Sequence, residues 1–483
     1  MRVLFTIYPN SFAHLYPVVP LAWALQSAGH EVRIATHHSS ADMIKGTGLT
    51  PVALGNPEQV PVRLTEDCSQ PAHPDLVLAY ADAMGLSVED REHWIVFFQY
   101  LLNPISDYVR VDRDEASDLV EFAKTWKPDL ILWDPTHPAG GVAGKVSGSA
   151  HARLLISQDQ FGWSLDRLAE SREALRAAGL DENPLATLLE PLAAKYGLSV
   201  DEELLVGQWT VDPMLEDFRL PTSTKKLPMR QVPYVDPQTF PGWLHQRPED
   251  ARCDCCGRAG VRRVALSLGE STRRFIPGDW DRAPKILKAC EGLEDLEFIA
   301  TLDKMQLADV DSVPANVRTF DWVPLPALVP TCSTLIHHGG NGTYASALAA
   351  AVPQLVCDLA GESVLLKLVE DEPDQLRTGT YRNGFEAGVR EETTSAGYHW
   401  ELPAKKIEAT PVSDFVIAKG VGDRLDHRAQ TVNEIRELIW HTAHDPARHH
   451  AAADLRNEWL AMPSPSDIIP DLEKLIAQNK RRL

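Results

Sequence analysis

The chain has 483 residues, more than one hydrophobic core normally holds, so we expect two domains. Hydrophobic residues make up 44% and charged residues 24%, which is typical of an ordinary globular protein. The formal net charge of −21 argues against a nucleic-acid partner or an anionic membrane surface, although it allows a local anion site. No apolar run is long enough to span a bilayer, and the N-terminus reads as a strand rather than a signal peptide, so we expect a cytoplasmic protein.

The cysteines favour a reduced protein rather than a disulfide framework or a metal centre. Cys290, Cys332 and Cys357 lie in apolar contexts, as reduced core residues do in cytoplasmic enzymes. Three more cysteines cluster within residues 253–256, but no second ligand pair follows at zinc-finger spacing. We therefore interpret the cluster as an exposed loop.

The first half alternates apolar runs with helical patterns. Strands are predicted at residues 3–7, 32–35, 129–133 and 153–157, and helices at 18–27 and 139–148. Continuous apolar strands separated by helices indicate a parallel sheet that is covered on both faces.

Residues 85–127 are predicted to be mostly helical and are rich in large apolar side chains such as Trp94, Phe97 and Phe98. Two interpretations stay open. One is a pair of core-packing helices, which we slightly favour because a dense aromatic stripe is more often core. The other is a surface that docks a partner or lines an acceptor pocket.

Proline recurs between residues 207 and 245, which indicates the connection between two domains. The α/β rhythm then resumes, with strands predicted at 264–268, 297–300, 317–320, 334–337 and 354–357, and a final helix at 466–479. We expect two doubly wound domains with a ligand cleft at the carboxyl ends of their strands. The expected limits are 1–215, a linker at 216–245, 246–462, and a C-terminal helix in 463–483 that packs back on the first domain.

One stretch, residues 370–414, shows many charges and little periodicity. It is far longer than the usual connection of about 4–6 residues, so it is either functional or disordered.

Residues 335–344 are the most informative stretch. An apolar strand ends in His337 and His338, a glycine turn follows, and a helix begins near Thr343. Glycines let the backbone approach a ligand, and the free amides of a helix N-terminus favour an anion. The pattern predicts binding of a phosphorylated small molecule, and the alternative is a plain strand-turn-helix with two buried histidines.

His14 and Asp134 each follow a predicted strand of the first domain, His14 after residues 3–7 and Asp134 after residues 129–133. Both side chains are therefore expected at the carboxyl ends of strands in one parallel sheet. A carboxylate there can fix the tautomer of an imidazole that acts as a base near neutral pH. Taken singly, His14 is more often a capping or packing residue, and Asp134 is equally well explained as a turn cap.

A family resemblance supports the catalytic interpretation. Residues 1–33, with His14, Pro20 and Gly29, resemble the opening of the antibiotic glycosyltransferases of actinomycetes, which are family 1 enzymes with the two-domain GT-B fold. The similarity is greatest to the desosaminyltransferase group of erythromycin biosynthesis. It continues in order at residues 126–130, 152–155, 206–213, 266–269 and 316–319.

The resemblance implies an inverting transfer of a deoxysugar from a TDP-sugar to a hydroxyl or other nucleophile of a polyketide or similar aglycone. It implies that His14 is the base and that Asp134 is its partner. The donor nucleotide and diphosphate would be bound by a larger set: Ser267, Gly269, Ser271, Trp322, Val323, His337, His338, Gly340, Asn341, Gly342 and Thr343. Members of this family need no cofactor or metal, so Asp309-Val310-Asp311 is interpreted as a solvated turn.

The chain departs from the family where the donor sugar is held. Family members carry Trp-Asp-Thr, or Asp-Gln in distant relatives, and here the matching residues are Gly361, Glu362 and Ser363. Glu362 and Ser363 keep an acid and a hydroxyl for the sugar, but the tryptophan is lost. The departure motivates an alternative, a non-catalytic glycosyltransferase-like subunit that binds nucleotide or a protein.

Two other enzyme classes fit less well. A sugar-nucleotide epimerase needs an acidic set that the chain does not offer, and a dinucleotide oxidoreductase needs a G-x-G-x-x-G after the first strand, which is missing. The resemblance also implies a P450-like auxiliary activator protein that docks on 85–127, and we further expect a homodimer.

Overall fold

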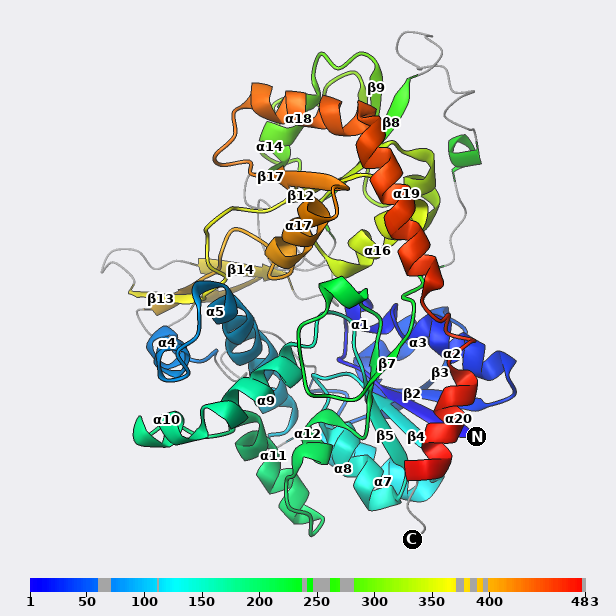
Figure 1. Ribbon diagram of the computed structural model, residues 1–483, viewed down its shortest axis with the longest axis vertical. Coiled ribbons are helices and arrows are strands. Elements are labelled where there is room, and N and C mark those ends of the chain that lie inside the picture. Colours follow the sequence, from blue (N-terminus) through cyan, green and yellow to red (C-terminus); the bar gives the residue numbers. More distant parts are fainter. Residues whose placement is uncertain are drawn as a thin grey trace.

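The computed structural model describes residues 1–59, 71–110, 113–236, 241–245, 261–269, 282–370, 378–382, 389–393 and 398–479. Two α/β units lie one above the other in Figure 1. Among the described residues, every helix is too short or too polar to span a lipid bilayer. The predicted cysteine loop at 253–256 and the site residue Ser271 lie outside the described residues.

In the described part of the first unit, all strand pairs are parallel and form one seven-stranded sheet in the order β3-β2-β1-β4-β5-β6-β7. The strands are β1 (Arg2–Thr6), β2 (Glu31–His37), β3 (Thr50–Leu54), β4 (Leu130–Trp133), β5 (Ala150–Leu154), β6 (Thr210–Asp212) and β7 (Lys226–Pro228). The helices around them are α1 (Phe12–Leu15), α2 (Val19–Ser27), α3 (Ala41–Gly46), α4 (Pro74–Ala83), α5 (Val88–Ile95), the π-helix η2 (Val96–Leu101), α6 (Leu102–Tyr108), α7 (Glu115–Trp126), α8 (Ala139–Ser147), α9 (Gln160–Glu170), α10 (Arg172–Ala177), α11 (Pro184–Lys195) and α12 (Glu202–Val206).

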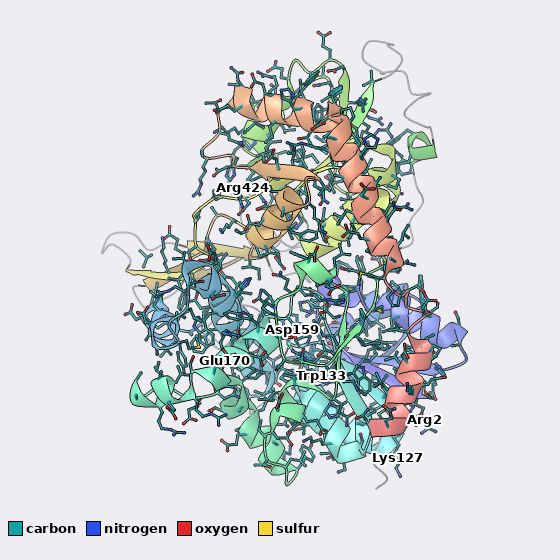
Figure 2. The ribbon with its side chains drawn as sticks, in the orientation of Figure 1. Arg2, Lys127, Trp133, Asp159, Glu170 and Arg424 are labelled. Carbon is teal, nitrogen blue, oxygen red and sulfur yellow. The ribbon has the colours of Figure 1, made fainter. Side chains whose placement is uncertain are left out.

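Both faces of this sheet are buried, which explains the continuous apolar runs. Along β1, Val3 and Phe5 pack into the core beneath α2, and Leu4 packs into the core on the opposite face beneath α7 and α8. Successive residues of a strand point to opposite faces, so a sheet covered on both sides needs apolar residues at every position. Helix α8 lies so close to β4 that a side-chain carbon on Gly140 would sit 2.4 Å from the Cβ atom of the buried Trp133 (Figure 2).

The second unit repeats this topology. Six of its described strands form a parallel sheet in the order β10-β9-β8-β11-β12-β17. The strands are β8 (Arg262–Ser267), β9 (Leu296–Thr301), β10 (Val317–Phe320), β11 (Thr334–His337), β12 (Gln354–Cys357) and β17 (Gly422–Leu425). The helices are α14 (Arg282–Cys290), α15 (Leu325–Leu328), α16 (Asn341–Ala350), α17 (Ala409–Ala418), α18 (Val432–His444), α19 (Pro446–Ala461) and α20 (Ile469–Asn479).

Two segments differ from what their sequence suggested. Two antiparallel ribbons occupy parts of residues 367–401 and so overlap the segment 370–414. In one, β13 (Lys367–Glu370) pairs with β16 (Tyr398–Glu401), and in the other β14 (Thr378–Arg382) pairs with β15 (Val389–Thr393). Strand β7 lies within the expected linker 216–245 and extends the first sheet, which therefore continues past residue 215. Helix α20 packs on the first unit, where Leu472 and Ile476 join the core of β1 and α2.

The aromatic residues of segment 85–127 are core residues. Trp94 and Phe97 are fully buried, and Phe98 stacks on Trp94 with ring centroids 4.9 Å apart. These rings pack with α9 and α11 into a core separate from that of the sheet. The slightly favoured interpretation of a core-packing helix pair is therefore correct for these side chains.

Candidate active site

His14 and Asp134 meet at the carboxyl ends of two adjacent strands. Strands β1 and β4 are paired so that Thr6 lies opposite Trp133, and Asp134 directly follows β4. His14 lies on the short helix α1 that follows β1. The His14 Nδ1 atom is 2.5 Å from the Asp134 Oδ2 atom, and the two side chains are 12% and 3% exposed. The structure thus places both residues in the arrangement in which a carboxylate orients an imidazole.

The second carboxylate oxygen of Asp134 is held by Thr136. Both the backbone N–H and the hydroxyl of Thr136 donate to Oδ1, at 2.8 and 2.7 Å. Burial by itself would raise the pKa of Asp134, but the charge of His14 and the hydrogen bonds from His14 and Thr136 outweigh it and lower that pKa below its usual value. Asp134 is therefore an ionised, immobile partner for His14.

Replacing Asp134 with asparagine is expected to flatten the acid limb of the stability profile. The pKa of Asp134 is lower in the folded than in the unfolded protein, so its carboxylate stabilises the fold at pH values above about 4. This stabilisation is lost as the pH falls through the folded-state pKa. Urea titrations between about pH 3 and 6 should show a smaller loss for Asp134→Asn than for the wild type, and the exposed Asp454→Asn should match the wild type. Identical acid limbs in all three proteins would contradict the assignment.

A second histidine, which the sequence analysis missed, lies beside this pair. His137 is fully buried, its Nδ1 atom is 2.9 Å from the Thr6 hydroxyl, and its ring stacks on Tyr108 at 4.0 Å. Burial lowers the pKa of His137 to about 3; the negative charge of Asp134 opposes this shift and the charge of His14 adds to it. The ring of Tyr8 lies 5.2 Å from that of His14. The only local signal for His137 was its position three residues after Asp134.

His337 is built into the protein and does not present a donor to a ligand. It is fully buried, its Nδ1 atom accepts the Gly339 N–H at 3.2 Å, and its Nε2 atom lies 3.0 Å from Gln354 Oε1. Burial lowers its pKa to about 4, against a smaller opposing effect of Gln354. Both ring nitrogens of His337 therefore have protein partners in this structure.

His338 is packed between two glycines. A Cβ atom on Gly269 or on Gly340 would lie 2.5 Å from the His338 Nε2 atom, so these glycines make room for the ring. The Nδ1 atom is 3.4 Å from the Ser267 carbonyl oxygen, which can only accept. Burial and the nearby charges of Arg282 and Lys406 hold the pKa of His338 well below its usual value. His338 is therefore neutral at physiological pH.

The N-terminus of α16 retains the features of an anion site. The amides of Thr343 and Tyr344 both donate to the Gly340 carbonyl oxygen. Within the described part of the chain, no acceptor is found for the amides of Asn341 and Gly342. A Cβ atom on Gly342 would meet nothing within 4 Å, so this end of the helix is open. Gly339 has a φ of +87°, and a Cβ atom there would strike Ala409 at 2.5 Å.

The other predicted donor residues lie at the carboxyl ends of the second sheet. Ser267 ends β8 and is buried, and Gly269 follows with a φ of +87°. After β10, Trp322 is 36% exposed, and the neighbouring Val323 is buried. The predicted turn at Asp309 and Asp311 is exposed, as expected for a solvated loop.

Glu362 and Ser363 follow β12 and are partly occupied by protein contacts. Glu362 accepts the Ala404 N–H at 3.1 Å and lies 3.4 Å from Arg428 Nη1. The Ser363 hydroxyl oxygen accepts the Leu365 N–H at 3.2 Å, and its side chain is at the surface.

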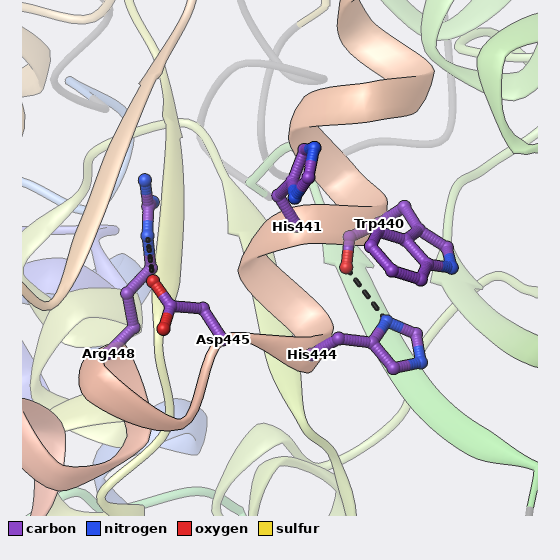
Figure 3. Close-up of a pocket in the computed structure, with 5 residues that line it drawn as sticks. All are labelled: Trp440, His441, His444, Asp445 and Arg448. Atoms are coloured by element: carbon purple, nitrogen blue, oxygen red, sulfur yellow. Dashed lines mark hydrogen bonds and ion pairs between the residues drawn. The ribbon is translucent and has the colours of Figure 1, made fainter.

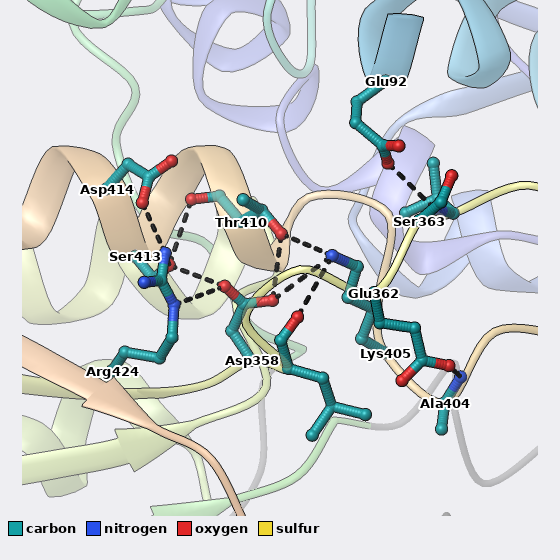
Figure 4. Close-up of polar contacts among 12 residues, drawn as sticks. Glu92, Asp358, Glu362, Ser363, Ala404, Lys405, Thr410, Ser413, Asp414 and Arg424 are labelled. Atoms are coloured by element: carbon teal, nitrogen blue, oxygen red, sulfur yellow. Dashed lines mark hydrogen bonds and ion pairs between the residues drawn. The ribbon is translucent and has the colours of Figure 1, made fainter. Parts of the chain in front are cut away.

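Asp358, another residue that the sequence analysis missed, anchors the loop that leads to Glu362 (Figure 4). This buried carboxylate accepts hydrogen bonds from Thr410 at 2.9 Å, Ser413 at 2.9 Å and Arg424 at 2.8 Å, and Lys405 lies 3.8 Å away. These partners come from the second half of the segment 370–414 and from β17. Residues 405–413 of this segment therefore hold Asp358, and with it the start of the loop that leads to Glu362.

A hollow on α18 and α19 is a separate feature (Figure 3). It is lined by Trp440, His441, His444, Asp445 and Arg448. Its charges are engaged locally, since Arg448 pairs with Asp423 at 2.7 Å and His444 Nδ1 lies 2.8 Å from the Trp440 carbonyl oxygen. None of the predicted site residues lines it.

The chain is similar to known proteins along most of its length. Residues 23–257 match the family described as "Erythromycin biosynthesis protein CIII-like, N-terminal domain", and residues 285–366 match its C-terminal domain. The chain is 34% identical to the aclacinomycin-T 2-deoxy-L-fucose transferase of Streptomyces galilaeus, over 100% of this chain and 97% of that protein. It is also 34% identical to the 10-deoxymethynolide desosaminyltransferase of Streptomyces venezuelae, over 100% and 98%.

Among solved structures, that of the glycosyltransferase VinC in complex with DTDP is 26% identical in sequence to this chain. The two match over 99% of this chain and 100% of the VinC chain, with a TM-score of 0.68. The predicted fold class, a GT-B arrangement of two doubly wound parallel-sheet domains, is confirmed. Because relatives at 34% identity span the whole chain, the protein belongs to the EryCIII-like glycosyltransferases.

Proposed function

We propose that this glycosyltransferase moves a deoxysugar from a TDP-sugar to a hydroxyl of a natural-product aglycone such as a polyketide, with inversion at the anomeric carbon. The observation that carries the proposal is the 2.5 Å contact between His14 and Asp134 at adjacent strand ends. The names of two relatives, a 2-deoxy-L-fucose transferase and a desosaminyltransferase, support the substrate class. The VinC structure supports a thymidine diphosphate donor.

In this mechanism Asp134 accepts the Nδ1–H of His14, which leaves the Nε2 lone pair of His14 to take the proton of the acceptor hydroxyl. The acceptor oxygen then attacks the anomeric carbon while the bond from that carbon to the diphosphate oxygen breaks. The leaving diphosphate gains negative charge, and the free amides of Asn341 and Gly342 at the N-terminus of α16 stabilise it.

The two units divide the substrates between them in this proposal. Residues 1–215 bind the acceptor, residues 216–245 connect the units, residues 246–462 bind the donor, and residues 463–483 return to the first unit. Ser267, Gly269 and Thr343 surround the diphosphate, Trp322 and Val323 contact the base, and Glu362 and Ser363 contact the sugar. The neutral His338 orients the backbone of Gly340 rather than donating to a phosphate.

A panel of TDP- and UDP-sugars in thermal unfolding tests the donor class. The panel contains TDP, TDP-desosamine, TDP-2-deoxy-L-fucose, TDP-glucose and UDP-glucose. A ligand that binds only the folded protein raises the unfolding temperature. At a ligand concentration of 100 times its Kd, the free energy of unfolding increases by about 2.7 kcal/mol. We expect the two TDP-deoxysugars to give larger shifts than TDP-glucose and UDP-glucose. Equal shifts for UDP-glucose and the TDP-deoxysugars would contradict the proposed donor class.

We also propose the partners and the location that the resemblance implies, namely an auxiliary activator protein, a homodimer and a cytoplasmic site of action. An activator on 85–127 would contact the outer face of α5, where Val88 is 79% exposed, because the aromatic residues of this segment are buried. The buried thiol of Cys290 forms no disulfide bond, as expected for a protein in a reducing compartment.

A further inference from the structure

A short segment of the second unit, residues 363–366, is bonded to the helices of the first unit; we call it the strap. The Val364 N–H donates to Glu92 Oε2 at 2.9 Å, and the Val364 carbonyl oxygen accepts the Tyr100 hydroxyl at 2.7 Å. Both partners belong to α5 and η2, more than 260 residues earlier in the chain. Figure 1 shows the following strand, β13, beside α5.

Gln99 forms a reciprocal pair with the strap. Its Oε1 atom accepts the Leu366 N–H at 2.9 Å, and its Nε2 atom donates to the Leu366 carbonyl oxygen at 3.2 Å. The side chain therefore pairs with the backbone as a neighbouring strand would. Gln99 is 1% exposed and also donates to the Ala72 carbonyl oxygen at 2.9 Å, which fixes its orientation.

The strap is also part of the helical core of the first unit. Val364 and Leu366 are 2% and 3% exposed, and Val364 packs in the core that contains Trp94 and Phe97. Water cannot readily replace the partners of such buried backbone groups, so each lost partner leaves an unsatisfied polar group. The π-helical turn presents Gln99 and Tyr100 to the strap, and π-helical turns are frequent at functional sites.

The strap directly follows the loop with Glu362, and this loop is held from the other side by the second unit (Figure 4). The Lys405 ammonium donates to the Leu359 carbonyl oxygen at 3.4 Å, and the Ala404 N–H donates to Glu362. Glu362 and Ser363 thus lie between an anchor in their own unit and one in the other. The position of the proposed sugar contacts therefore depends on both units.

We propose that Gln99 and Tyr100 are positioning residues for the donor sugar: from the acceptor unit, they hold the strap and thereby place Glu362 and Ser363. This inference rests on the proposed function. It assigns a role in donor recognition to residues of the unit that binds the acceptor. The diphosphate contacts at α16 lie outside the strap and do not depend on it.

Amide hydrogen exchange at Leu366 measures directly whether Gln99 holds the strap. Gln99→Met keeps a side chain of similar length but loses both hydrogen bonds to Leu366 and the one to the Ala72 carbonyl oxygen, and Tyr100→Phe loses only the hydroxyl. We expect the Leu366 amide to exchange about tenfold faster in Gln99→Met, as expected for the loss of roughly one to two hydrogen bonds. Tyr196→Phe is the matched control, because its hydroxyl lies 3.4 Å from the Ser117 carbonyl oxygen, far from the strap in sequence and contacts.

Donor kinetics measure the consequence. For the TDP-deoxysugar that gives the largest shift in the panel, we expect the donor KM to rise about tenfold in Gln99→Met and about threefold in Tyr100→Phe. We expect kcat to stay within about twofold and the Kd of TDP, which lacks the sugar, to stay unchanged. A merely structural role would weaken TDP and TDP-sugar alike.

The outcomes separate this inference from the proposed function. An unchanged exchange rate of the Leu366 amide in Gln99→Met would show that Gln99 does not hold the strap. Faster exchange with an unchanged donor KM in both variants would show that holding the strap does not position the donor sugar. Failure of every TDP-sugar to bind the wild type would refute the proposed function and, with it, a role of the strap in sugar positioning. The rate of exchange would still decide whether Gln99 holds the strap.

Discussion

Replacing His14 with alanine is expected to lower kcat by about 10²–10⁴-fold while leaving TDP binding intact. The imidazole is the proposed base, and no other titratable side chain is bonded to Asp134 among the contacts described. Without it, the acceptor hydroxyl must lose its proton to water, which is a weaker base. The diphosphate contacts lie on the other unit, at α16. Turnover with the best donor of the panel and the thermal shift with TDP give the two readouts.

Two comparisons make this prediction decisive. The exposed His450→Ala on α19 is the matched control and should keep wild-type turnover. A normal TDP shift in His14→Ala shows that the variant is folded, so that a loss of turnover reports on chemistry. If His14→Ala retains full activity, His14 is not the base.

Removing the Asp159 carboxylate is expected to lower the free energy of unfolding by about 3–5 kcal/mol. Asp159 is 2% exposed at the side chain and binds both terminal nitrogens of the fully buried Arg153, at 2.8 and 2.7 Å. It also accepts the Gly162 N–H at 2.8 Å and so caps α9. Asp159→Ala therefore leaves a buried guanidinium charge without its counter-ion and a helix without its cap.

The surface pair on the same helix is the control. Arg167 and Glu170 lie at i and i+3 on α9, with side chains 34% and 59% exposed, and Figure 2 shows both Asp159 and Glu170. Glu170→Ala should change the unfolding free energy by less than about 1 kcal/mol, because water screens an exposed ion pair. Urea unfolding followed by tryptophan fluorescence compares the two variants. Similar losses for both would show that burial does not set the strength of the Arg153 pair.

The central strands could be predicted because buried strands are runs of mostly apolar residues, which can be recognised in the sequence. The runs at 317–320, 334–337 and 354–357 match β10, β11 and β12 to the residue. The edge strand β17 was missed because Asp423 and Arg424 face partners outside the sheet core. Strand β5 was predicted three residues too late, since Arg153 looks like a strand start, but its charge is neutralised inside the protein by Asp159.

The candidate site was predictable only where topology determines it. His14 and Asp134 each follow a strand, and neighbouring parallel strands end at the same edge of the sheet, so their approach follows from the strand order. The role of His337 could not be read in this way. It depends on Gln354, seventeen residues later in the chain, because the Gln354 Oε1 atom lies 3.0 Å from the His337 Nε2 atom. The strap was hidden for the same reason, because its partners lie more than 260 residues earlier.

The chain passes between the two units twice, and the two passages run side by side. The Arg230 N–H donates to the Pro463 carbonyl oxygen at 2.6 Å, and the Trp459 indole N–H donates to the Gln231 carbonyl oxygen at 3.2 Å. Strand β13, which follows the strap, lies on the opposite side of Figure 1, beside α5. The bonds of Gln99 and Tyr100 to the strap therefore join the two units at a second place, away from both connections, and moving η2 away from the strap would break them.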